Sequence, residues 1–340
     1  MARHLKINFG RIIFSVLLLL FFIFVAVRFS QAQQVAHQIF QFHWYVILLL
    51  LILEALALWG RGQVYRTVYN KMGIKMSSKE AFYLHIASYT VNVLAPSGGI
   101  SGVGIFVSDA LRRGVKRSRA VISSFIYYLT EYINLALLVL ASIIYMFLAN
   151  RLQMQYVTIF IIFAVILIGL VAIFIWLVGR KHLFIKLMSG LIRVINVFLK
   201  LIRLKIISQE SAYRAHESCI ELAVLIKRDK TVLIVPWLIF LAVAICEILM
   251  LKLVYYALGA AIPLEALLVG YSLGLLVITI SVTPAGIGIA EPTMAVIFVS
   301  LGADLRSSVI AILIFRAITT WLPLVPGVLI LEGMTNNGEK

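Results

Sequence analysis

Six ionisable residues lie in stretches of the sequence that are otherwise almost wholly apolar: Glu54, Glu131, Glu247, Lys252, Glu291 and Arg316. A charge at the centre of a bilayer costs about 2.5 to 3.5 kcal/mol on insertion scales, so each is expected to face a partner or a polar cavity. Arg316 has suitable chemistry for a phosphate group, because a guanidinium can donate two parallel hydrogen bonds to it.

The acidic residues of this set suggest three roles. An ion pair of Arg316 with Glu131 or with Glu291 fits the sequence, and either pair could be purely structural. Glu131 or Glu291 could instead bind and release an ion or a proton, as a coupling residue does. For Glu54 and Glu247 we expect structural roles at helix contacts.

Two runs rich in proline and glycine interrupt apolar sequence: "APSGGISG", which begins at Ala95, and "TPAGIGIAE", which begins at Thr283. A helix break frees backbone groups that lipid cannot satisfy, so it must face protein, water or a polar ligand. A helix N-terminus at such a point favours an anion. The candidate substrate-binding residues are therefore Asn92, Pro96, Ser97, Gly98, Gly99 and Ser101 at the first break, and Pro284, Gly286, Gly288, Glu291 and Arg316 at the second. For the glycines alone, close helix packing is an equally good explanation, since Gly98 and Gly102, like Gly270 and Gly274, have a small-xxx-small spacing.

The composition identifies the class of protein that holds these residues. The chain has 340 residues, of which 63% are hydrophobic and 13% charged, whereas soluble domains carry about 25% charged residues. This indicates an integral membrane protein. The net charge of +16 is explained by membrane topology and an anionic leaflet rather than by nucleic acid. Cys219 and Cys246 form no CxxC motif, so we expect no disulfide, metal site or cofactor.

Long apolar stretches predict an all-α polytopic membrane protein with about six full transmembrane helices. These spans are expected near Ile12–Val27, Trp44–Trp59, Val121–Leu148, Val157–Val178, Val232–Leu258 and Val309–Leu331.

Clusters of Lys and Arg alternate with weakly charged connections, which places the basic side and both termini in the cytoplasm. The two broken regions, about 80–109 and about 264–301, are then predicted to be re-entrant helical hairpins that enter from opposite sides. An ordinary spanning course of either region is the alternative.

The two breaks also resemble each other. Pro96 aligns with Pro284, Gly98 with Gly286 and Val121 with Val309 at one constant offset. Because the copies enter from opposite sides, they predict an inverted-topology repeat, a plan found in transporters whose substrates bind where broken helices meet.

A basic segment over residues 180–230 divides the N-terminal half, 1–179, from the C-terminal half, 231–340. Within it, Ala212, Ala215, Cys219, Leu222 and Ile226 recur at helical spacing and predict an amphipathic helix on the cytoplasmic face. Arg112 and Arg113 follow the first break. Membrane topology explains most of the basic residues there, and the more specific alternative is that Arg112 and Arg113 guide anionic lipid headgroups.

The sequence resembles the flippase-like family of the lysylphosphatidylglycerol synthase transmembrane region. The resemblance lies in Pro284, Gly286, Gly288, Glu291 and the arginine of "ILIFRAITT", Arg316, and more weakly in Asn92, Pro96, Gly98 and Gly99. Where many members have a Gly-Glu pair after the first break, this chain has Ser101-Gly102. In larger members a separate soluble domain makes an aminoacylated phospholipid that the membrane region translocates; no room for that domain is expected here.

The leading hypothesis is therefore a lipid flippase, not an enzyme, in a bacterial or archaeal cytoplasmic membrane. Its substrate would be a phospholipid or another lipid with a polar headgroup, such as an aminoacylated lipid or a lipid-linked glycan. The alternatives are a scaffold or accessory subunit of a lipid-modifying partner enzyme and, with less support, a lipid-linked transferase. The sequence is compatible with a monomer and with a homo-oligomer. No GxxxxGK[ST] motif is present, so we expect no internal ATP-driven step.

Overall fold

The computed structural model describes residues 38–336, apart from 40, 95–99, 202–207 and 282. These described residues contain helices and connections but no strand. Within the described residues, four helices are long and apolar enough to cross a membrane, and shorter apolar helices accompany them. The prediction of an all-α polytopic membrane protein is confirmed, while the predicted first span, Ile12–Val27, lies outside the described residues.

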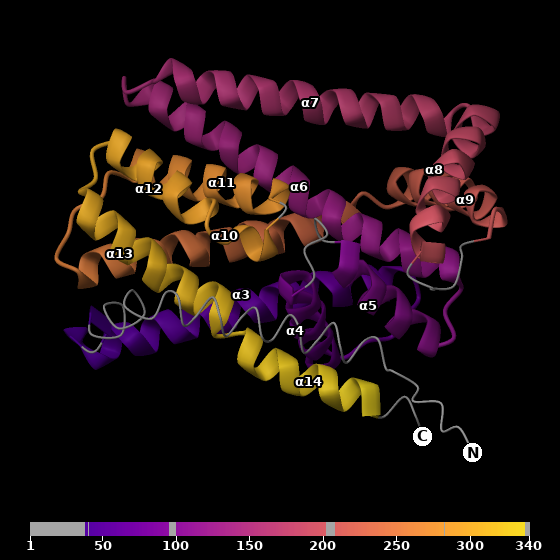
Figure 1. Ribbon diagram of the computed structural model, residues 1–340, viewed down its shortest axis with the longest axis horizontal. Coiled ribbons are helices and arrows are strands. Elements are labelled where there is room, and N and C mark those ends of the chain that lie inside the picture. The colour runs from indigo at the N-terminus through magenta and orange to yellow at the C-terminus, as the bar shows by residue number, and fades with distance from the viewer. Residues whose placement is uncertain (1–37, 40, 95–99, 202–207, 282, 337–340) are drawn as a thin grey trace. The chain divides into compact units, whose positions relative to one another are not determined.

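The elements appear in Figure 1 and follow one another along the chain as α3 (Trp44–Lys71), α4 (Ser78–Leu94), α5 (Ile100–Arg112), α6 (Arg117–Leu148), α7 (Met154–Val178), α8 (Lys181–Leu201), α9 (Glu210–Arg228), α10 (Thr231–Ala257), α11 (Leu264–Ile280), η1 (Pro284–Gly286), α12 (Ala290–Ser300), α13 (Leu305–Arg316), η2 (Ala317–Trp321) and α14 (Leu324–Asn336).

The chain divides into two compact units. Unit 1 comprises the residues up to Gly62, Phe82–Ile105 and the residues from Ala242 onward. Unit 2 comprises Gln63–Ala81 and Phe106–Leu241. Unit 1 therefore holds the described parts of both helix breaks, with α11, α12, α13 and α14, whereas unit 2 holds α6, α7, α8 and α9.

The second broken region is a helical hairpin within unit 1. Helix α11 packs along α12, and the contact is close because Gly270 lies against the ring of Phe298 and Gly274 against Met294. For these two glycines, close helix packing is thus what the structure shows. At the base of the hairpin, a Cβ on Gly302 would lie 3.7 Å from Pro263, so the chain returns to where α11 began.

The first broken region also returns on itself. Near its tip, in unit 1, Gly102 of α5 approaches Ser88 and Asn92 of α4. At its base, in unit 2, Arg113 after α5 is 3.3 Å from Glu80 of α4.

Helix α3 differs from its predicted bounds. The expected span ended at Trp59, with the following basic residues in a loop, but the helix continues to Lys71. Arg61, Arg66 and Lys71 therefore lie on the helix. No glycine–proline pair stops it, and charged side chains on a helix end cost little once they reach polar partners.

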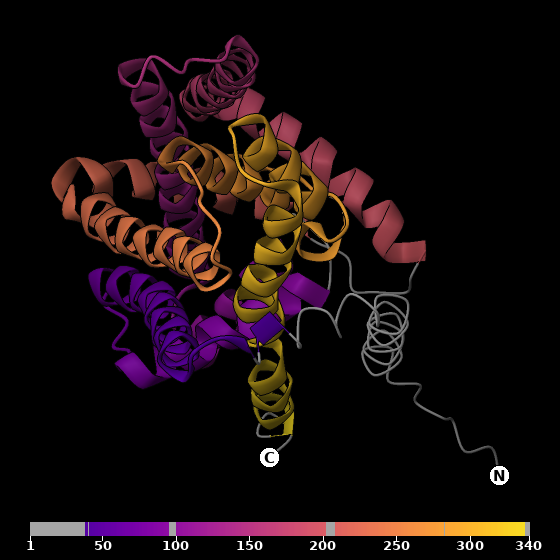
Figure 2. The same cartoon turned by 90° about the vertical axis from the view of Figure 1, so that its left-hand side faces the viewer.

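The last predicted span, Val309–Leu331, lies within a helical stretch, Leu305–Leu331, that is long and apolar enough to cross a membrane. Inside it the backbone forms a π-helical turn over Ala317–Trp321, and α14 begins at Leu324. Pro323 lacks the N–H that regular α-helical hydrogen bonding needs, and such turns recur at functional sites. Figures 1 and 2 show α14 continuing beyond α13 after this turn.

The amphipathic helix predicted within 180–230 is α9, preceded by the separate helix α8. Ala212 and Leu222 are buried, as the spacing predicted, and Ala215, Cys219 and Ile226 are half-buried. His216 is also buried, and its Nε2 lies 2.9 Å from the carbonyl oxygen of Val178.

Candidate functional site

The second break is a tight turn with left-handed backbone. Ala285, Gly286 and Gly288 have φ angles of 50°, 70° and 80°. Two of these positions are glycines, which adopt such angles without steric cost. Ala285 is not, and a non-glycine residue in this region costs about 1 to 2 kcal/mol. Strain of this kind persists only where surrounding contacts hold it, and it concentrates at functional sites.

Arg316 is the contact that holds this turn. It is the last residue of α13, and only 4% of its surface is exposed. Its Nε donates to Oε1 of Glu291 at 3.1 Å, and one Nη2 hydrogen is donated to the carbonyl oxygen of Ala285. The guanidinium thus satisfies the carbonyl of the strained residue, a group that lipid could not satisfy.

Glu291 completes the turn from the other side. It lies in the first turn of α12, where a carboxylate is favoured by the helix dipole. Its Oε2 accepts a hydrogen bond of 2.7 Å from the backbone N–H of Gly288. Of the two ion pairs that the sequence suggested for Arg316, the structure forms the one with Glu291.

The guanidinium retains capacity for another ligand. Nε and Nη2 are engaged, whereas Nη1 makes no hydrogen bond with any residue that the structure describes. A planar guanidinium with a vacant N–H edge can bind one more anionic oxygen. The site can therefore bind an anion without first losing its ion pair.

Helix α4 contacts the segment that follows Arg316. The hydroxyl of Tyr89 donates to the carbonyl oxygen of Thr319 at 3.0 Å, inside the π-helical turn. Further on, Gly327 of α14 lies against Thr90 and Ile86. Sequence reasoning missed Tyr89, and no local pattern marks it, because it depends on a contact between residues 230 positions apart.

The first break is only partly described. Pro96, Ser97, Gly98 and Gly99 lie outside the described residues, and nothing is described of the Ser101 side chain. Asn92 lies in α4, and its Oδ1 accepts a 2.6 Å hydrogen bond from the backbone N–H of Gly102. That N–H belongs to the first turn of α5, which has no intrahelical acceptor for it. Asn92 thus closes the tip of the hairpin.

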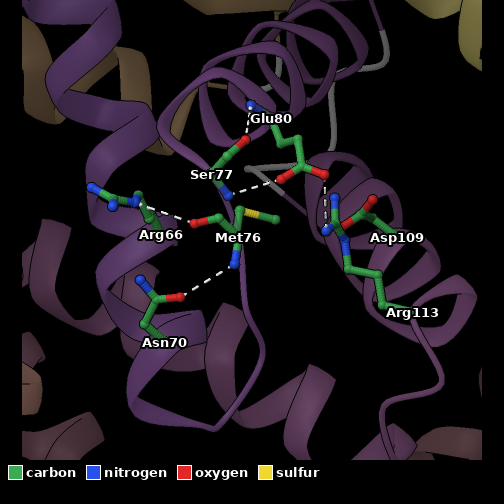
Figure 3. Close-up of polar contacts among 7 residues, drawn as sticks. All are labelled: Arg66, Asn70, Met76, Ser77, Glu80, Asp109 and Arg113. Atoms are coloured by element: carbon green, nitrogen blue, oxygen red, sulfur yellow. Dashed lines mark hydrogen bonds and ion pairs between the residues drawn. The ribbon is translucent and has the colours of Figure 1, made fainter.

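The base of the first hairpin is a polar cluster in unit 2 (Figure 3). Ser77 and Glu80 form a capping box: the Glu80 N–H donates to Ser77 Oγ at 3.2 Å, and the Ser77 N–H donates to Glu80 Oε2 at 2.8 Å. These hydrogen bonds, with a smaller contribution from Arg113, hold the pKa of Glu80 below its ordinary value of 4.5.

Arg113 forms two ion pairs at the base of the first hairpin. It donates to Asp109 at 2.8 Å and to Glu80 at 3.3 Å, as Figure 3 shows. It therefore joins the end of α5 to the start of α4, which a role in headgroup guidance alone would not require. Arg112 is exposed, and the prediction that Arg112 and Arg113 guide headgroups stays a prediction.

Glu131 lies half-buried on α6 in unit 2, near enough to Tyr65 of the same unit to interact electrostatically. Its proposed role in coupling stays a prediction. Glu54 and Glu247, for which the sequence indicated helix contacts, are both buried in unit 1. Glu247 on α10 accepts hydrogen bonds from Arg61 of α3 and from the hydroxyl of Tyr271 of α11.

Arg61 was missed as a site residue because it was assigned to a loop. The signal was nonetheless present: Glu54 and Arg61 are seven residues apart, about two helical turns, and so share a face. Among the described residues, no group of three or more His, Cys, Asp or Glu could hold a metal ion.

Comparison with known proteins gives the affiliation of the chain. None of the curated proteins is similar enough to match it. A family model described as the lysylphosphatidylglycerol synthase TM region matches residues 12–327. That range covers almost the whole chain, and it includes both helix breaks, Glu291 and Arg316. The protein therefore belongs to the family of the lysylphosphatidylglycerol synthase transmembrane region.

Proposed function

We propose that this protein moves a lipid with a polar headgroup between the two leaflets of a membrane. The substrate is a phospholipid, which could be aminoacylated, or a lipid-linked glycan. Its headgroup enters between the two broken-helix hairpins while the acyl chains stay in the bilayer. Membership of a family named for the membrane region of a lipid synthase supports a role in lipid metabolism.

One observation carries the proposal: a buried arginine lies at a strained helix break inside apolar sequence. Arg316 contacts Glu291 and the carbonyl of Ala285, and its Nη1 makes no hydrogen bond with any described residue. A phosphate oxygen bound at Nη1 would gain a charge-assisted hydrogen bond in a medium that weakly screens charge. The N-terminus of α12, next to Glu291, adds a favourable dipole for an anion.

The alternative is an accessory subunit that recruits a lipid-modifying enzyme through its basic surface. The observation in its favour is that Arg316 and Glu291 already form a buried pair, which could serve only to hold the break together. Loss of the pair in a folded protein would reduce lipid movement by a transporter, whereas an accessory subunit would still bind its partner enzyme.

The test is lipid movement in proteoliposomes that contain the purified full chain. The probes are fluorescent phosphatidylglycerol, phosphatidylethanolamine and lysylphosphatidylglycerol, and the readout is the rate at which the label changes leaflet. We expect the wild type to accelerate at least one probe. We expect Arg316→Gln to reduce that rate by tenfold or more, because about 1.4 kcal/mol of headgroup binding corresponds to a factor of ten.

A matched control comes from an exposed pair of the same types. Arg214 and Glu210 lie 3.8 Å apart on α9, with side chains 52% and 82% exposed, so Arg214→Gln should leave the rate unchanged. Arg316→Lys separates the functions: it keeps the charge but not the fork of donors, so a folded Arg316→Lys protein should still transport slowly. No movement of any probe by the wild type would overturn the proposal and favour the accessory subunit.

A further inference from the structure

Glu54 of α3, in unit 1, is a buried carboxyl group with an unsatisfied oxygen. Only 3% of its surface is exposed. Its Oε2 atom is buried and has no hydrogen-bond partner among the described residues. An ionised carboxylate in such a place is very costly, and in practice the group takes up a proton instead.

A neighbouring carboxylate increases that cost, and the neighbouring cation offsets it only in part. Glu247 on α10 is close enough to Glu54 for the two carboxylates to repel each other, and Arg61 of α3 is the nearby cation. Arg61, however, forms an ion pair with Glu247, whose other oxygen accepts a 2.6 Å hydrogen bond from the Tyr271 hydroxyl. Both oxygens of Glu247 are thus occupied, and the one guanidinium is shared by two acids.

The remaining titratable groups around Glu54 come from α4. Tyr89 interacts electrostatically with Glu54, with Arg61 and with Arg316. His85 is 4% exposed, interacts with Arg61, and has a buried Nε2 without a hydrogen-bond partner among the described residues. A cation at Arg61 disfavours a second positive charge on that imidazole. The cluster therefore has two carboxylates, one fixed cation and two neutral groups.

We propose that the Glu54–Glu247 pair is a proton-binding site, in which Glu54 holds the proton while Glu247 stays paired with Arg61. Two carboxylates that share a site and one cation retain one proton between them. The unpaired Oε2 of Glu54 is the atom that carries it.

The placement of this site suggests what the proton does. Tyr89 interacts with both Glu54 and Arg316, and its hydroxyl holds the π-helical turn that begins after Arg316. Gain or loss of the Glu54 proton changes the charge next to this tyrosine and so biases the position of the headgroup site. This second step, in which the proton gradient drives lipid movement, rests on the proposed function; the binding of the proton does not.

The first test measures the proton directly. Infrared difference spectra of the full chain in lipid nanodiscs are recorded as the pH is raised, and the carbonyl stretch of a protonated carboxylic acid is followed. We expect this band in the wild type near neutral pH, its loss at higher pH, and its absence in Glu54→Gln. The exposed control Glu210→Gln should retain it. A wild type without the band, or a Glu54→Gln protein that keeps it, overturns the proposal.

A second variant covers failure of Glu54→Gln to fold. In Glu247→Gln the repelling carboxylate is gone and Arg61 is released to Glu54, so the proton should be lost more readily. We expect the band to disappear at a proton concentration at least about tenfold higher than in the wild type. A band that disappears at the same pH in Glu247→Gln and in the wild type contradicts a shared site.

The second test addresses the coupling. In proteoliposomes, the rate of lipid movement is compared with and without an imposed pH gradient, and separately with a sodium gradient. The pH gradient should change the rate in the wild type and in Glu210→Gln but not in Glu54→Gln. A response to sodium alone overturns proton coupling. If no lipid moves in the wild type, the proposed function fails, whereas the infrared result still decides the proton site.

Discussion

At the scale of single residues, the second break combines strain with polar contacts that make the strain tolerable. Ala285 is in the left-handed region, and its carbonyl is bound by Arg316. Gly288 donates to Glu291, which also accepts from Arg316. Four residues therefore depend on one another, and the loss of one leaves a buried polar group unsatisfied, which costs about 1 to 3 kcal/mol.

The glycines of the two breaks should respond differently to substitution. A Cβ at Gly286 would lie 3.0 Å from the Cα of Ile278, and its φ of +70° is strained for any other residue. Gly286→Ala should therefore destabilise the protein by about 1 to 2 kcal/mol. The measurement is the thermal unfolding midpoint in detergent.

Gly104 is the matched control for that substitution. It lies inside α5, with ordinary helical backbone and nothing within 4 Å of a Cβ. Alanine is a better helix former than glycine by about 1 kcal/mol, so Gly104→Ala should raise the midpoint. Equal effects of the two substitutions would contradict the geometry of the turn.

At the scale of elements, both broken regions are hairpins whose arms are held at the base and near the tip. The second hairpin relies on glycines beneath Phe298 and Met294. The first relies on polar groups, with Asn92 near its tip and Glu80 and Arg113 at its base. The base of the first hairpin therefore includes an exposed titratable carboxylate, Glu80.

The capping box of α4 allows a prediction about pH. The pKa of Glu80 is lowered in the folded protein, mainly by the Ser77 hydrogen bonds. A carboxyl with a lowered folded pKa stabilises the protein above its ordinary pKa of 4.5, and that contribution is lost as the pH falls below 4.5. Because the side chain is 49% exposed, the contribution is small, about 0.5 kcal/mol.

Unfolding of the wild type and of Glu80→Gln should be compared between about pH 7 and about pH 3, which lie on either side of that titration. The wild type should be slightly more stable at the upper limit, and the two should converge at the lower one. A constant difference across this range would mean that Glu80 does not act as a charged cap.

The contact between α4 and α14 gives a prediction about transport. Gly327 lies so close to Thr90 that a Cβ there must displace the Thr90 side chain or move one of the two helices. Gly327→Val should therefore separate α14 from α4, weaken the Tyr89–Thr319 hydrogen bond and reduce lipid movement several-fold. Thr90→Ala in the same protein should restore part of the rate, because it removes the obstructing hydroxyl. No rescue would mean that the loss arises elsewhere.

At the scale of the whole molecule, the basic residues predict which connections face the cytoplasm. Arg112 follows the first hairpin and Arg306 follows the second. If the hairpins enter from opposite sides, these two positions lie on opposite sides of the membrane.

Cysteine labelling tests this arrangement. After replacement of Cys219 and Cys246 by serine, Arg306→Cys should react with a membrane-impermeant maleimide added to intact cells. Arg112→Cys should react only once the cells are opened. Reaction of both from the outside would exclude the inverted repeat.

The sequence by itself determined the class of the protein and most of its spans. Apolar length predicts α6 and α10 nearly to their ends, because a bilayer-crossing helix must be about 20 residues long. The proline–glycine runs located both breaks, since backbone chemistry is local. The sequence also indicated that Arg316 needs a partner, and it offered Glu291 and Glu131 equally.

Only the tertiary structure decided which groups meet. It paired Arg316 with Glu291, continued α3 through Arg61, and placed a π-helical turn within the last span after Arg316. It also brought Glu54, Glu247 and Tyr89 together from three helices. These outcomes depend on contacts between residues far apart in the chain, and a local pattern of apolar and charged residues carries no information about which distant partner satisfies a buried charge.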